Sequence, residues 1–592
     1  MLKIFSRKKE KNFYLPGQEI KINKTSSFNN YSVGGDPVNV CKNRVVFAAI
    51  MFVFVYAVIV WRLFNVCVMP NINSNQQQMA SEDADSKPTF LKSPIKRADI
   101  LDRNGAIIAT SLPTVNLYAH PKKILDAKTA AIELARVLPD FRYEDLLERL
   151  SRKSNFVYIK RNLSPSQQYQ INALGIPGLE FESGEKRIYP HKNLFAHIVG
   201  RTNIDNQGIA GIEKELDERL TQSNIPLNLT IDAGVQDTIR DILVEAVKQF
   251  KADGAVAVLM DVNNAEIVSM VSFPDFDPNS GKNPSERAAF NFATLGVYEP
   301  GSVFKIFNTA MSLESGKIRV ADKFDATKPL KVRSNYIKDY RGENRWLSVG
   351  EILTHSSNIG SALMALKVGS KEQKDFVTNL GFTKTIDLEV TEKARPIVPR
   401  EWKEDTIATV AYGYGISVTP IHVITAFSSV INGGTYHAPS LLKDSTKKDN
   451  GYRVISNNTS KSMRKLLRDV VTDGSGKRAN VLGYEVAGKT GTANKLVNGR
   501  YVDKKVMATF VSTFPASNPK YALLVMMDEP KGSKETYGFT TSGWNAVPTA
   551  AKIIEAIAPQ LNVKANYDLD EKRKARIIEA SGQPLKGDVP DR

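Results

Sequence analysis

The chain of 592 residues contains little cysteine and little histidine, and these shortages exclude several classes of protein. The two cysteines, Cys41 and Cys67, lie on either side of one apolar segment near the N-terminus, where they cannot cross-link a fold. The six histidines include no pair at the spacing that metal ligands need. We therefore expect neither a disulfide scaffold nor a metal site, and we expect no cofactor.

Acidic residues are also too few to balance the basic ones. The chain has 80 lysines and arginines against 63 aspartates and glutamates, a formal net charge of +17. Such an excess can indicate a nucleic acid or another anionic polymer as partner. The sequence shows no zinc-finger spacing, no phosphate-cradling loop and no basic patch interleaved with aromatic residues. We therefore expect no nucleic acid, and the charge favours a membrane protein with basic flanks and a generally basic surface.

One apolar run near the N-terminus covers residues 45–61 and continues, after a single arginine, to residue 69. Its length suits a membrane-spanning helix. The polar, basic stretch before it is far too long for the start of a cleaved signal peptide, and Val66 stands where a lipoprotein cysteine needs a small residue. We predict a retained single-pass anchor over residues 45–69, with residues 1–44 as a basic cytoplasmic tail.

The rest of the chain is too long for one compact domain and divides by composition. Residues 70–90 are rich in Asn, Gln, Ser and Asp, which indicates a linker. Residues 91–225 contain a strand, an Asn-Gly turn and a second strand at 99–109, then helical segments near 125–151 and 164–173. No nucleophile stands there beside a base, so we predict a noncatalytic pedestal domain.

Residues 226–565 are predicted to form the catalytic domain, followed by a charged tail at 566–592. A strand near 228–232 leads into an amphipathic helix. The five predicted strands of the sheet are Ala255–Val262, Glu266–Phe273, Tyr484–Thr492, Val506–Phe514 and Tyr521–Met527. Helical patches and loops fill residues 303–480, and a helix at 548–557 closes the domain. We therefore predict an α+β fold with an antiparallel sheet of about five strands, covered by helices and interrupted by a helical insertion.

The stretch YEPGSVFKIF at 298–307 places a serine after a Pro-Gly turn, at the start of an apolar, helix-like run. Residues three apart share a face of a helix, so Ser302 and Lys305 can touch. A serine hydroxyl is a weak nucleophile until a base takes its proton. A lysine in an apolar pocket or beside another cation can be that base. We predict Ser302 as the nucleophile and Lys305 as its base.

The Ser-x-x-Lys pattern is common by itself. It recurs at Ser93/Lys96, Ser183/Lys186, Ser462/Lys465 and Ser517/Lys520. A solvated surface pair is the ordinary interpretation of such a pattern. The pattern at Ser302 differs in its Pro-Gly turn and in two motifs that follow it in order, Ser-Ser-Asn at 356–358 and Lys-Thr-Gly-Thr at 489–492.

The residue types of these two later motifs suit the same chemistry. The Ser356 hydroxyl can relay a proton, and the Asn358 amide can hold a substrate backbone and orient Lys305. A second ammonium group, on Lys489, lowers the pKa of the first lysine and attracts a carboxylate. Three substrate-binding residues complete the predicted site. The hydroxyls of Thr490 and Thr492 bind this carboxylate, and Gly491 allows a backbone to approach closely.

The ordered motifs resemble those of the penicillin-binding proteins and serine β-lactamases, and the resemblance extends from residue 45 to about residue 560. Two parts of the pedestal, RADILDRNG at 97–105 and the stretch from Tyr189 to Glu213, resemble the monofunctional class B type. Ala98 stands where that family usually has glycine. No glycosyltransferase-like segment separates the anchor from the pedestal, which argues against the bifunctional class A type.

Within class B, four segments are similar to the division (septal) transpeptidase: YEPGS at 298–302, SSNIG at 356–360, YGYGISVTP at 412–420 and residues 489–495. The elongation transpeptidase, which commonly has Cys-Asp in place of Ser357-Asn358, is the alternative within the class.

The resemblance implies a septal peptidoglycan D,D-transpeptidase. Ser302 would attack the penultimate D-Ala carbonyl of a stem peptide, expel the terminal D-Ala and pass the acyl group to an amine of a neighbouring stem peptide. Backbone N–H groups of Ser302 and Thr492 would form the oxyanion hole, and β-lactams would acylate the same serine. The implied partners are the lipid-linked precursor, the nascent glycan, a septal glycan polymerase and other division membrane proteins. The implied location is the division site of the bacterial inner membrane, with the catalytic domain in the periplasm.

Three other functions fit part of these observations. A D,D-carboxypeptidase or β-lactamase would release the acyl group to water, but no Glu-x-x-Leu-Asn follows the Ser-x-Asn motif. A β-lactam sensor would signal through membrane helices, of which it usually has several, and one is predicted here. A scaffold with a vestigial pocket is disfavoured because the chemical residues are intact: Ser302, Lys305, Ser356, Asn358 and Lys489.

Overall fold

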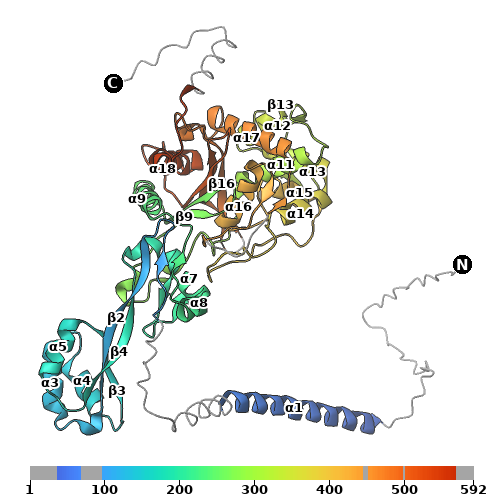
Figure 1. Ribbon diagram of the computed structural model, residues 1–592. Coiled ribbons are helices and arrows are strands. Elements are labelled where there is room, and N and C mark those ends of the chain that lie inside the picture. The colour runs from blue at the N-terminus through green and yellow to red at the C-terminus, as the bar shows by residue number, and fades with distance from the viewer. Residues whose placement is uncertain (1–36, 68–95, 444–450, 498–499, 569–592) are drawn as a thin grey trace, which may run out of the picture. The chain divides into compact units, whose positions relative to one another are not determined.

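The computed structural model describes residues 37–67, 96–443, 451–497 and 500–568 (Figure 1). By its internal contacts the chain divides into two compact units, Met1–Leu91 and Lys92–Arg592. The predicted linker at 70–90, most of the predicted tail at 1–44 and most of the predicted tail at 566–592 lie outside the described residues.

The first unit contains the helix α1 (Pro37–Cys67), whose large apolar side chains between Val46 and Trp61 are exposed. Within the part of the chain that the structure describes, no helix combines the length and the apolar character that a membrane crossing requires. The predicted anchor at 45–69 overlaps α1 and ends outside the described residues, so the anchor stays a prediction.

The pedestal is built on β2 (Ile107–Ala119), a long strand that pairs antiparallel with β4 (Leu179–Ile188) and, near its end, with β3 (Val157–Leu163). The start of β2 pairs antiparallel with β1 (Ile100–Leu101), which lies parallel to β7 (Leu227–Asn228). The pairing of β1 with β2 confirms the predicted strand, Asn-Gly turn and strand.

Three helices pack against one face of this sheet: α3 (Ala127–Val137), α4 (Tyr143–Leu150) and α5 (Pro165–Ala173). The helical segment predicted at 125–151 is therefore two helices. Pro139 explains the break, because the residue before a proline is disfavoured in helical geometry. The rest of the pedestal holds a small hairpin and short helices: β5 (Arg201–Thr202), β6 (Gly208–Ala210), α6 (Ala196–Val199), α7 (Gly211–Glu215) and α8 (Asp217–Gln222).

The catalytic domain contains the predicted five-stranded antiparallel sheet, in the order β16-β17-β18-β8-β9. Its strands are β8 (Gly254–Asp261), β9 (Ile267–Phe273), β16 (Ala487–Val497), β17 (Arg500–Phe514) and β18 (Tyr521–Asp528). Nearly every side chain of the central strands β8 and β18 is buried, because helices cover both faces. Strand β16 lies at one edge of the sheet.

Alternate side chains of β8 belong to two different cores. Leu259 packs with α9 (Ala233–Phe250) and α18 (Ala546–Gln560), whereas Val258 packs on the opposite face with α16 (Pro420–Ile431). Figure 1 shows α9 and α18 on one side of the sheet and α16 on the other. Because successive side chains of a strand point to opposite faces of the sheet, the closing helix α18 packs on one face and α16 of the helical insertion packs on the other.

The segment between β9 and β16 consists mainly of helices and loops, as predicted, and its described part also contains short pairs of strands. Their strands have two or three residues, too few for an alternating pattern to show in the sequence. The helices are α10 (Glu286–Ala289), α11 (Lys305–Glu314), α12 (Val349–Thr354), α13 (Asn358–Val368), α14 (Ser370–Asn379), α15 (Glu404–Val410), α16 and α17 (Asn457–Thr472). The paired strands are β10 (Lys323–Asp325) with β13 (Trp346–Ser348), β11 (Leu330–Val332) with β12 (Asn335–Ile337), and β14 (Thr435–Tyr436) with β15 (Tyr452–Arg453).

Candidate active site

Ser302 lies in a single 3-10 turn, Gly301–Phe304, that runs directly into α11. Gly301 has a φ of +52°, a conformation that glycine adopts easily, and its N–H donates to the carbonyl of Gly413 at 3.2 Å. The two residues after the serine are buried in the core, whereas Ser302 itself is partly exposed. The turn therefore presents the serine hydroxyl at the start of a helix, as the sequence predicts.

Lys305 is the first residue of α11, and its side chain is fully buried. Its Nζ lies 2.9 Å from the Oγ of Ser302, and 3.1 Å and 2.7 Å from the Oγ and carbonyl oxygen of Ser356. The Oδ1 of Asn358 is also 2.7 Å away. An ammonium group can donate hydrogens to three of these four oxygens. A neutral amine can donate two hydrogens and accept one from a serine hydroxyl, which is the arrangement that a general base needs.

The edge strand β16 places a second buried lysine, Lys489, beside Ser356. Its Nζ lies 3.1 Å from the Oγ of Ser356 and 3.2 Å from the carbonyl oxygen of Thr490. Burial lowers the pKa of Lys489 to about 7. Burial is also the main reason that the pKa of Lys305 lies well below its ordinary value; the charge of Lys489 lowers it further, and the Asp339 carboxylate opposes the shift. Both lysines therefore lose their protons more readily than in water.

Ser356 connects the two lysines, since its hydroxyl lies 3.1 Å from each Nζ. Its φ of +61° is in the left-handed region, which is unfavourable for a residue with a side chain. The next residue, Ser357, caps α13 by accepting a hydrogen bond from the N–H of Gly360 at 3.0 Å. The strained turn thus directs three oxygens at Lys305: the Oγ and the carbonyl oxygen of Ser356 and the Oδ1 of Asn358.

Gly491 lies where β16 passes the turn that carries the nucleophile. A Cβ at this position would come within 2.7 Å of the Val303 side chain and 2.9 Å of the Pro300 carbonyl oxygen. The sequence predicts a close backbone approach here, and the structure identifies the neighbour as the protein's own turn around Ser302. A side chain at this position would push the edge strand away from the nucleophile.

The hydroxyls of Thr490 and Thr492 have partners within the protein. The Oγ1 of Thr490 lies 2.6 Å from the Oγ of Ser475, and the Oγ1 of Thr492 accepts a hydrogen bond from the N–H of Ser542 at 3.1 Å. A hydroxyl has one donor and two acceptor positions, so both keep capacity for a further bond. Their role in binding a substrate carboxylate stays a prediction.

Three polar residues next to these motifs were absent from the sequence prediction. Asp339 accepts hydrogen bonds from the Ser-Ser-Asn turn. The Ser475 hydroxyl forms a hydrogen bond with the hydroxyl of Thr490 in the Lys-Thr-Gly motif. Glu299 accepts a hydrogen bond from the loop at 412–416. Glu299 stands inside the YEPGS motif, which could have drawn attention to it. Asp339 and Ser475 lie in loops without any sequence pattern, so only the tertiary structure finds them.

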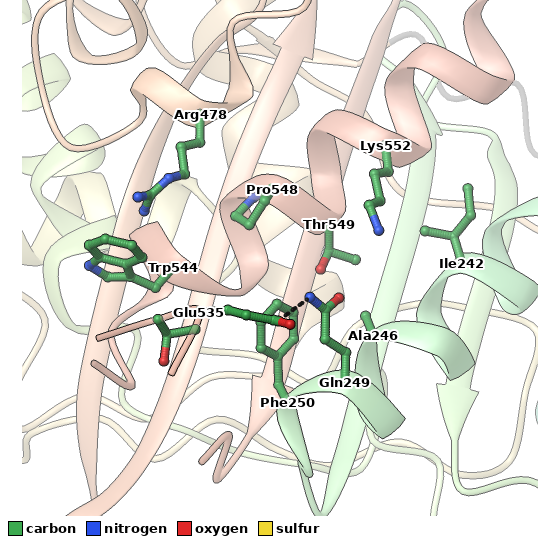
Figure 2. A pocket seen from close by; sticks show the side chains of 11 residues that line it. Ile242, Ala246, Gln249, Phe250, Arg478, Glu535, Trp544, Pro548, Thr549 and Lys552 are labelled. Atoms are coloured by element: carbon green, nitrogen blue, oxygen red, sulfur yellow. Dashed lines mark hydrogen bonds between the residues drawn. The ribbon is translucent and has the colours of Figure 1, made fainter. Parts of the chain in front are cut away.

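A separate pocket of about 160 Å³ lies between α9 and α18 (Figure 2). These two helices cover the sheet face opposite α16. In its wall the guanidinium of Arg478 lies 3.5 Å from the ring centroid of Trp544. The amide of Gln249 donates to the carboxylate of Glu535 at 3.2 Å. None of the predicted site residues lines this pocket. The candidate active site is therefore defined by the contacts of the buried lysines.

Two family models match the chain in succession. The model described as Penicillin-binding Protein dimerisation domain matches residues 92–225. The model described as Penicillin binding protein transpeptidase domain matches residues 255–555. The first match covers most of the pedestal, and the second covers the five-stranded sheet, the helical insertion and every predicted site residue.

Known relatives match most of the chain. The probable peptidoglycan D,D-transpeptidase FtsI of Caulobacter vibrioides is 36% identical over 487 residues, which are 80% of this chain and 82% of the relative. The probable peptidoglycan D,D-transpeptidase PenA of Neisseria meningitidis is 31% identical over 470 residues, 74% of this chain and 80% of the relative. The crystal structure of penicillin binding protein 3 from Mycobacterium tuberculosis, complexed with aztreonam, shares the fold at a TM-score of 0.64 and 21% identity, covering 80% of this chain and 98% of that one.

These matches agree with the geometry of the site and with the α+β fold. The transpeptidase model covers the domain in which a buried lysine contacts a partly exposed serine, and the dimerisation model covers the domain before it. The relatives are similar across both domains and not in one motif alone. The chain therefore belongs to the penicillin-binding proteins, as a class B peptidoglycan D,D-transpeptidase of the septal type.

Proposed function

We propose that Ser302 is the nucleophile of this transpeptidase and that Lys305 is its general base. The observation that supports this most directly is the distance of 2.9 Å between the Ser302 Oγ and the Nζ of a fully buried Lys305. The serine oxygen attacks the carbonyl carbon of the penultimate D-Ala of a stem peptide, and its proton passes to the lysine. Backbone N–H groups of Ser302 and Thr492 hold the oxyanion of the tetrahedral intermediate.

Ser356 returns the proton to the leaving group in this proposal. When the bond to the terminal D-Ala breaks, the nitrogen of that residue needs a hydrogen. The Ser356 hydroxyl can supply it and take another from Lys305, because the two groups are 3.1 Å apart. An amine of a neighbouring stem peptide then attacks the acyl-enzyme and loses a proton to the lysine, and the lysine passes that proton to the Ser302 oxygen as the bond between this oxygen and the acyl carbon breaks. One cross-link is formed, one D-Ala is released, and the enzyme regains its starting protonation.

The edge position of β16 supports the proposed binding of the acyl-donor peptide. An edge strand can pair with an extended peptide through its free backbone groups. A peptide aligned on β16 would place its terminal carboxylate near Lys489, Thr490 and Thr492. The Asn358 amide would hold the peptide backbone on the opposite side of Ser302.

The proposed cellular setting comes from the sequence. Residues 45–69 anchor the protein in the inner membrane, and the basic residues before them keep the N-terminus in the cytoplasm. The pedestal at 91–225 and the catalytic domain at 226–565 then lie in the periplasm at the division site. The proposed partners are a septal glycan polymerase and other division membrane proteins, and the substrates are stem peptides of the lipid-linked precursor and the nascent glycan.

The test is covalent labelling with a fluorescent penicillin, followed over time in the full-length protein. We expect a stable label on the wild type, no label on Ser302→Ala, and acylation slowed about 10²- to 10⁴-fold in Lys305→Ala. The matched controls are Ser462→Ala and Lys465→Ala, which alter another Ser-x-x-Lys pair in the same domain, with Lys465 exposed. Both controls should label like the wild type.

Two outcomes would contradict the assignment. Normal labelling of Lys305→Ala would remove the lysine from its role as base. A wild-type label that appears and disappears within seconds would indicate rapid hydrolysis of the acyl-enzyme, as in a carboxypeptidase or β-lactamase.

A further inference from the structure

Lys495 lies on the edge strand β16, three residues after Thr492. Its Nζ donates to the Oδ1 of Asp528 at 2.6 Å and to the Oε1 of Glu529 at 3.0 Å. Asp528 ends β18, and the two acidic residues are only 3% and 7% exposed. Because β17 lies between β16 and β18 in the sheet, this lysine connects the edge strand to a strand that is not its neighbour.

The backbone pairing of β16 with β17 is irregular at Lys495. The regular register ends where Asn494 pairs with Val506. It resumes where Leu496 pairs with Tyr501, so that β17 has more residues in the gap than β16. Such an irregularity disrupts the ladder, bends a strand and increases its twist. The ion pairs of Lys495 therefore fix the strand at a point where backbone hydrogen bonds do not.

Lys495 differs in its charge from the two lysines of the candidate active site. Burial lowers its pKa, but the hydrogen bonds and charges of Asp528 and Glu529 outweigh this effect, so the pKa is raised above the ordinary value. Hydrogen bonds between two charged groups are also stronger than neutral ones. The side chain is therefore suited to anchor β16 and not to carry a proton during the reaction.

The part of β16 just before Lys495 packs against the turn that carries the nucleophile. A Cβ at Gly301 would come within 3.2 Å of the Ala493 side chain and 3.4 Å of the Thr492 carbonyl oxygen. Together with the close approach at Gly491, these contacts place the edge strand directly beside the turn. A small change in the course of β16 would therefore alter the space between its free edge and Ser302.

We propose that Lys495 is a positioning residue for the acyl-donor peptide, since its ion pairs with Asp528 and Glu529 hold the edge strand in the course along which the peptide pairs beside Ser302. This inference rests on the function proposed above, in which the donor peptide aligns on β16. Lys495 acts through the strand and not on the reacting atoms. Its loss should weaken donor binding and leave the chemical step unchanged.

The experiment measures acylation of the full-length protein by fluorescent penicillin over a range of concentrations, together with the melting temperature. It separates the half-saturation concentration from the limiting rate. We expect Lys495→Met to raise the half-saturation concentration about 10-fold, from the loss of charged hydrogen bonds, at an unchanged limiting rate. A soluble peptide ending in D-Ala-D-Ala should also compete less well with the label.

Two further variants sharpen this test. Lys495→Arg keeps the charge and can donate to both carboxylates, so it should restore most of the affinity. If it binds as weakly as Lys495→Met, the ion pairs do not position the strand and the proposal is overturned. The matched control is Lys505→Met on β17, whose Nζ lies 3.9 Å from the same Glu529 carboxylate and whose side chain is 49% exposed; it should change neither quantity.

A merely structural role would give a different result. Lys495→Met would then lower the melting temperature and the fraction of active protein, while the folded fraction would keep the wild-type half-saturation concentration. That outcome overturns the proposal, as does a lower limiting rate at an unchanged half-saturation concentration. If Lys495→Met does not fold, Glu529→Gln serves instead, because Asp528 then keeps both Lys495 and Arg287 as partners. A smaller rise in its half-saturation concentration supports the proposal, and a wild-type value overturns it.

This inference and the proposed function fail in distinguishable ways. If Lys305→Ala reacts at the wild-type limiting rate, the proposed function fails and takes this inference with it. If Lys305→Ala is inactive and Lys495→Met has the wild-type half-saturation concentration, only the role of Lys495 is wrong.

Discussion

Among the residues that the structure describes, the pedestal and the catalytic domain each bury two lysine or arginine side chains, and the two pairs differ in the groups that surround them. In the pedestal, Arg97 and Arg187 bond to the two oxygens of the buried Glu213 carboxylate, at 2.7 and 2.6 Å. In the catalytic domain, the oxygens that contact Lys305 and Lys489 belong to hydroxyls, an amide and backbone carbonyls. A carboxylate in contact compensates a buried cation, whereas neutral oxygens leave much of the desolvation cost in place.

This difference separates two uses of buried charge. The arginines form ion pairs with Glu213 that connect the start of the pedestal to β4 and α7, which is a structural use. The lysines have lowered pKa values, so they give up a proton more readily than a lysine in water, which is a chemical use. A buried cation without a carboxylate in contact is therefore the better indicator of catalysis in this chain.

The largest effect on stability is expected from removing the Glu213 carboxylate, which pairs with the two buried arginines. Glu213→Gln leaves the buried Arg187 guanidinium without its carboxylate partner and leaves Arg97 with Asp217 alone, and the loss of one partner of a buried pair costs about 3–5 kcal/mol. We expect the free energy of unfolding to fall by this amount in urea titrations, with an unchanged acylation rate in the folded fraction. The control is Glu218→Gln, an exposed carboxylate on the nearby α8. Equal stability of the two variants would break the comparison on the pedestal side.

A smaller effect of opposite sign is expected at the uncompensated lysine. Between the folded pKa of Lys489, about 7, and its ordinary value of 10.5, the unfolded chain holds the proton that the folded chain has lost, so wild-type stability rises with pH in this window. Below pH 7 the folded protein bears the full cost of the buried charge. Lys489→Met removes that cost, and we expect a gain of about 2–4 kcal/mol at pH 6 that shrinks toward pH 10, with loss of acylation.

Unfolding measurements at several pH values check this expectation. A stability gain that is the same at every pH would mean that the methionine stabilises the protein through packing and not by removing the buried charge. A loss of stability at pH 6 would mean that the neutral oxygens around the lysine compensate its charge after all.

The smallest effect concerns the strained residue between the lysines. Ser356→Gly and Ser356→Ala both remove the hydroxyl, so both should lose acylation to a similar degree. Only glycine adopts a φ near +61° without strain, which favours the folded glycine variant. The greater freedom of glycine in the unfolded chain offsets part of this advantage. We expect the glycine variant to be about 0.5–1 kcal/mol more stable than the alanine variant in thermal unfolding. An alanine variant of equal or greater stability would mean that the turn stores no strain.

Local pattern was sufficient for much of this molecule. The strand-like runs at 255–262, 266–273, 484–492, 506–514 and 521–527 predicted the central sheet, because residues that favour strands gather there in short segments. The motifs around Ser302, Ser356 and Lys489 predicted the residues that the structure brings together. The split of the long pedestal helix was missed although Pro139 marks it, and the short hairpins of the insertion were missed because two or three residues carry no period.

What the sequence by itself determined is the set of reactive residue types and the order in which the chain presents them. Only the tertiary structure decided their environment: that both lysines are fully buried, that Ser356 lies between them, and that Asp339 holds the turn from another segment. The physical reason is that a pKa and a hydrogen-bond direction depend on solvent exclusion and on neighbours distant in the chain, and no local pattern contains that information.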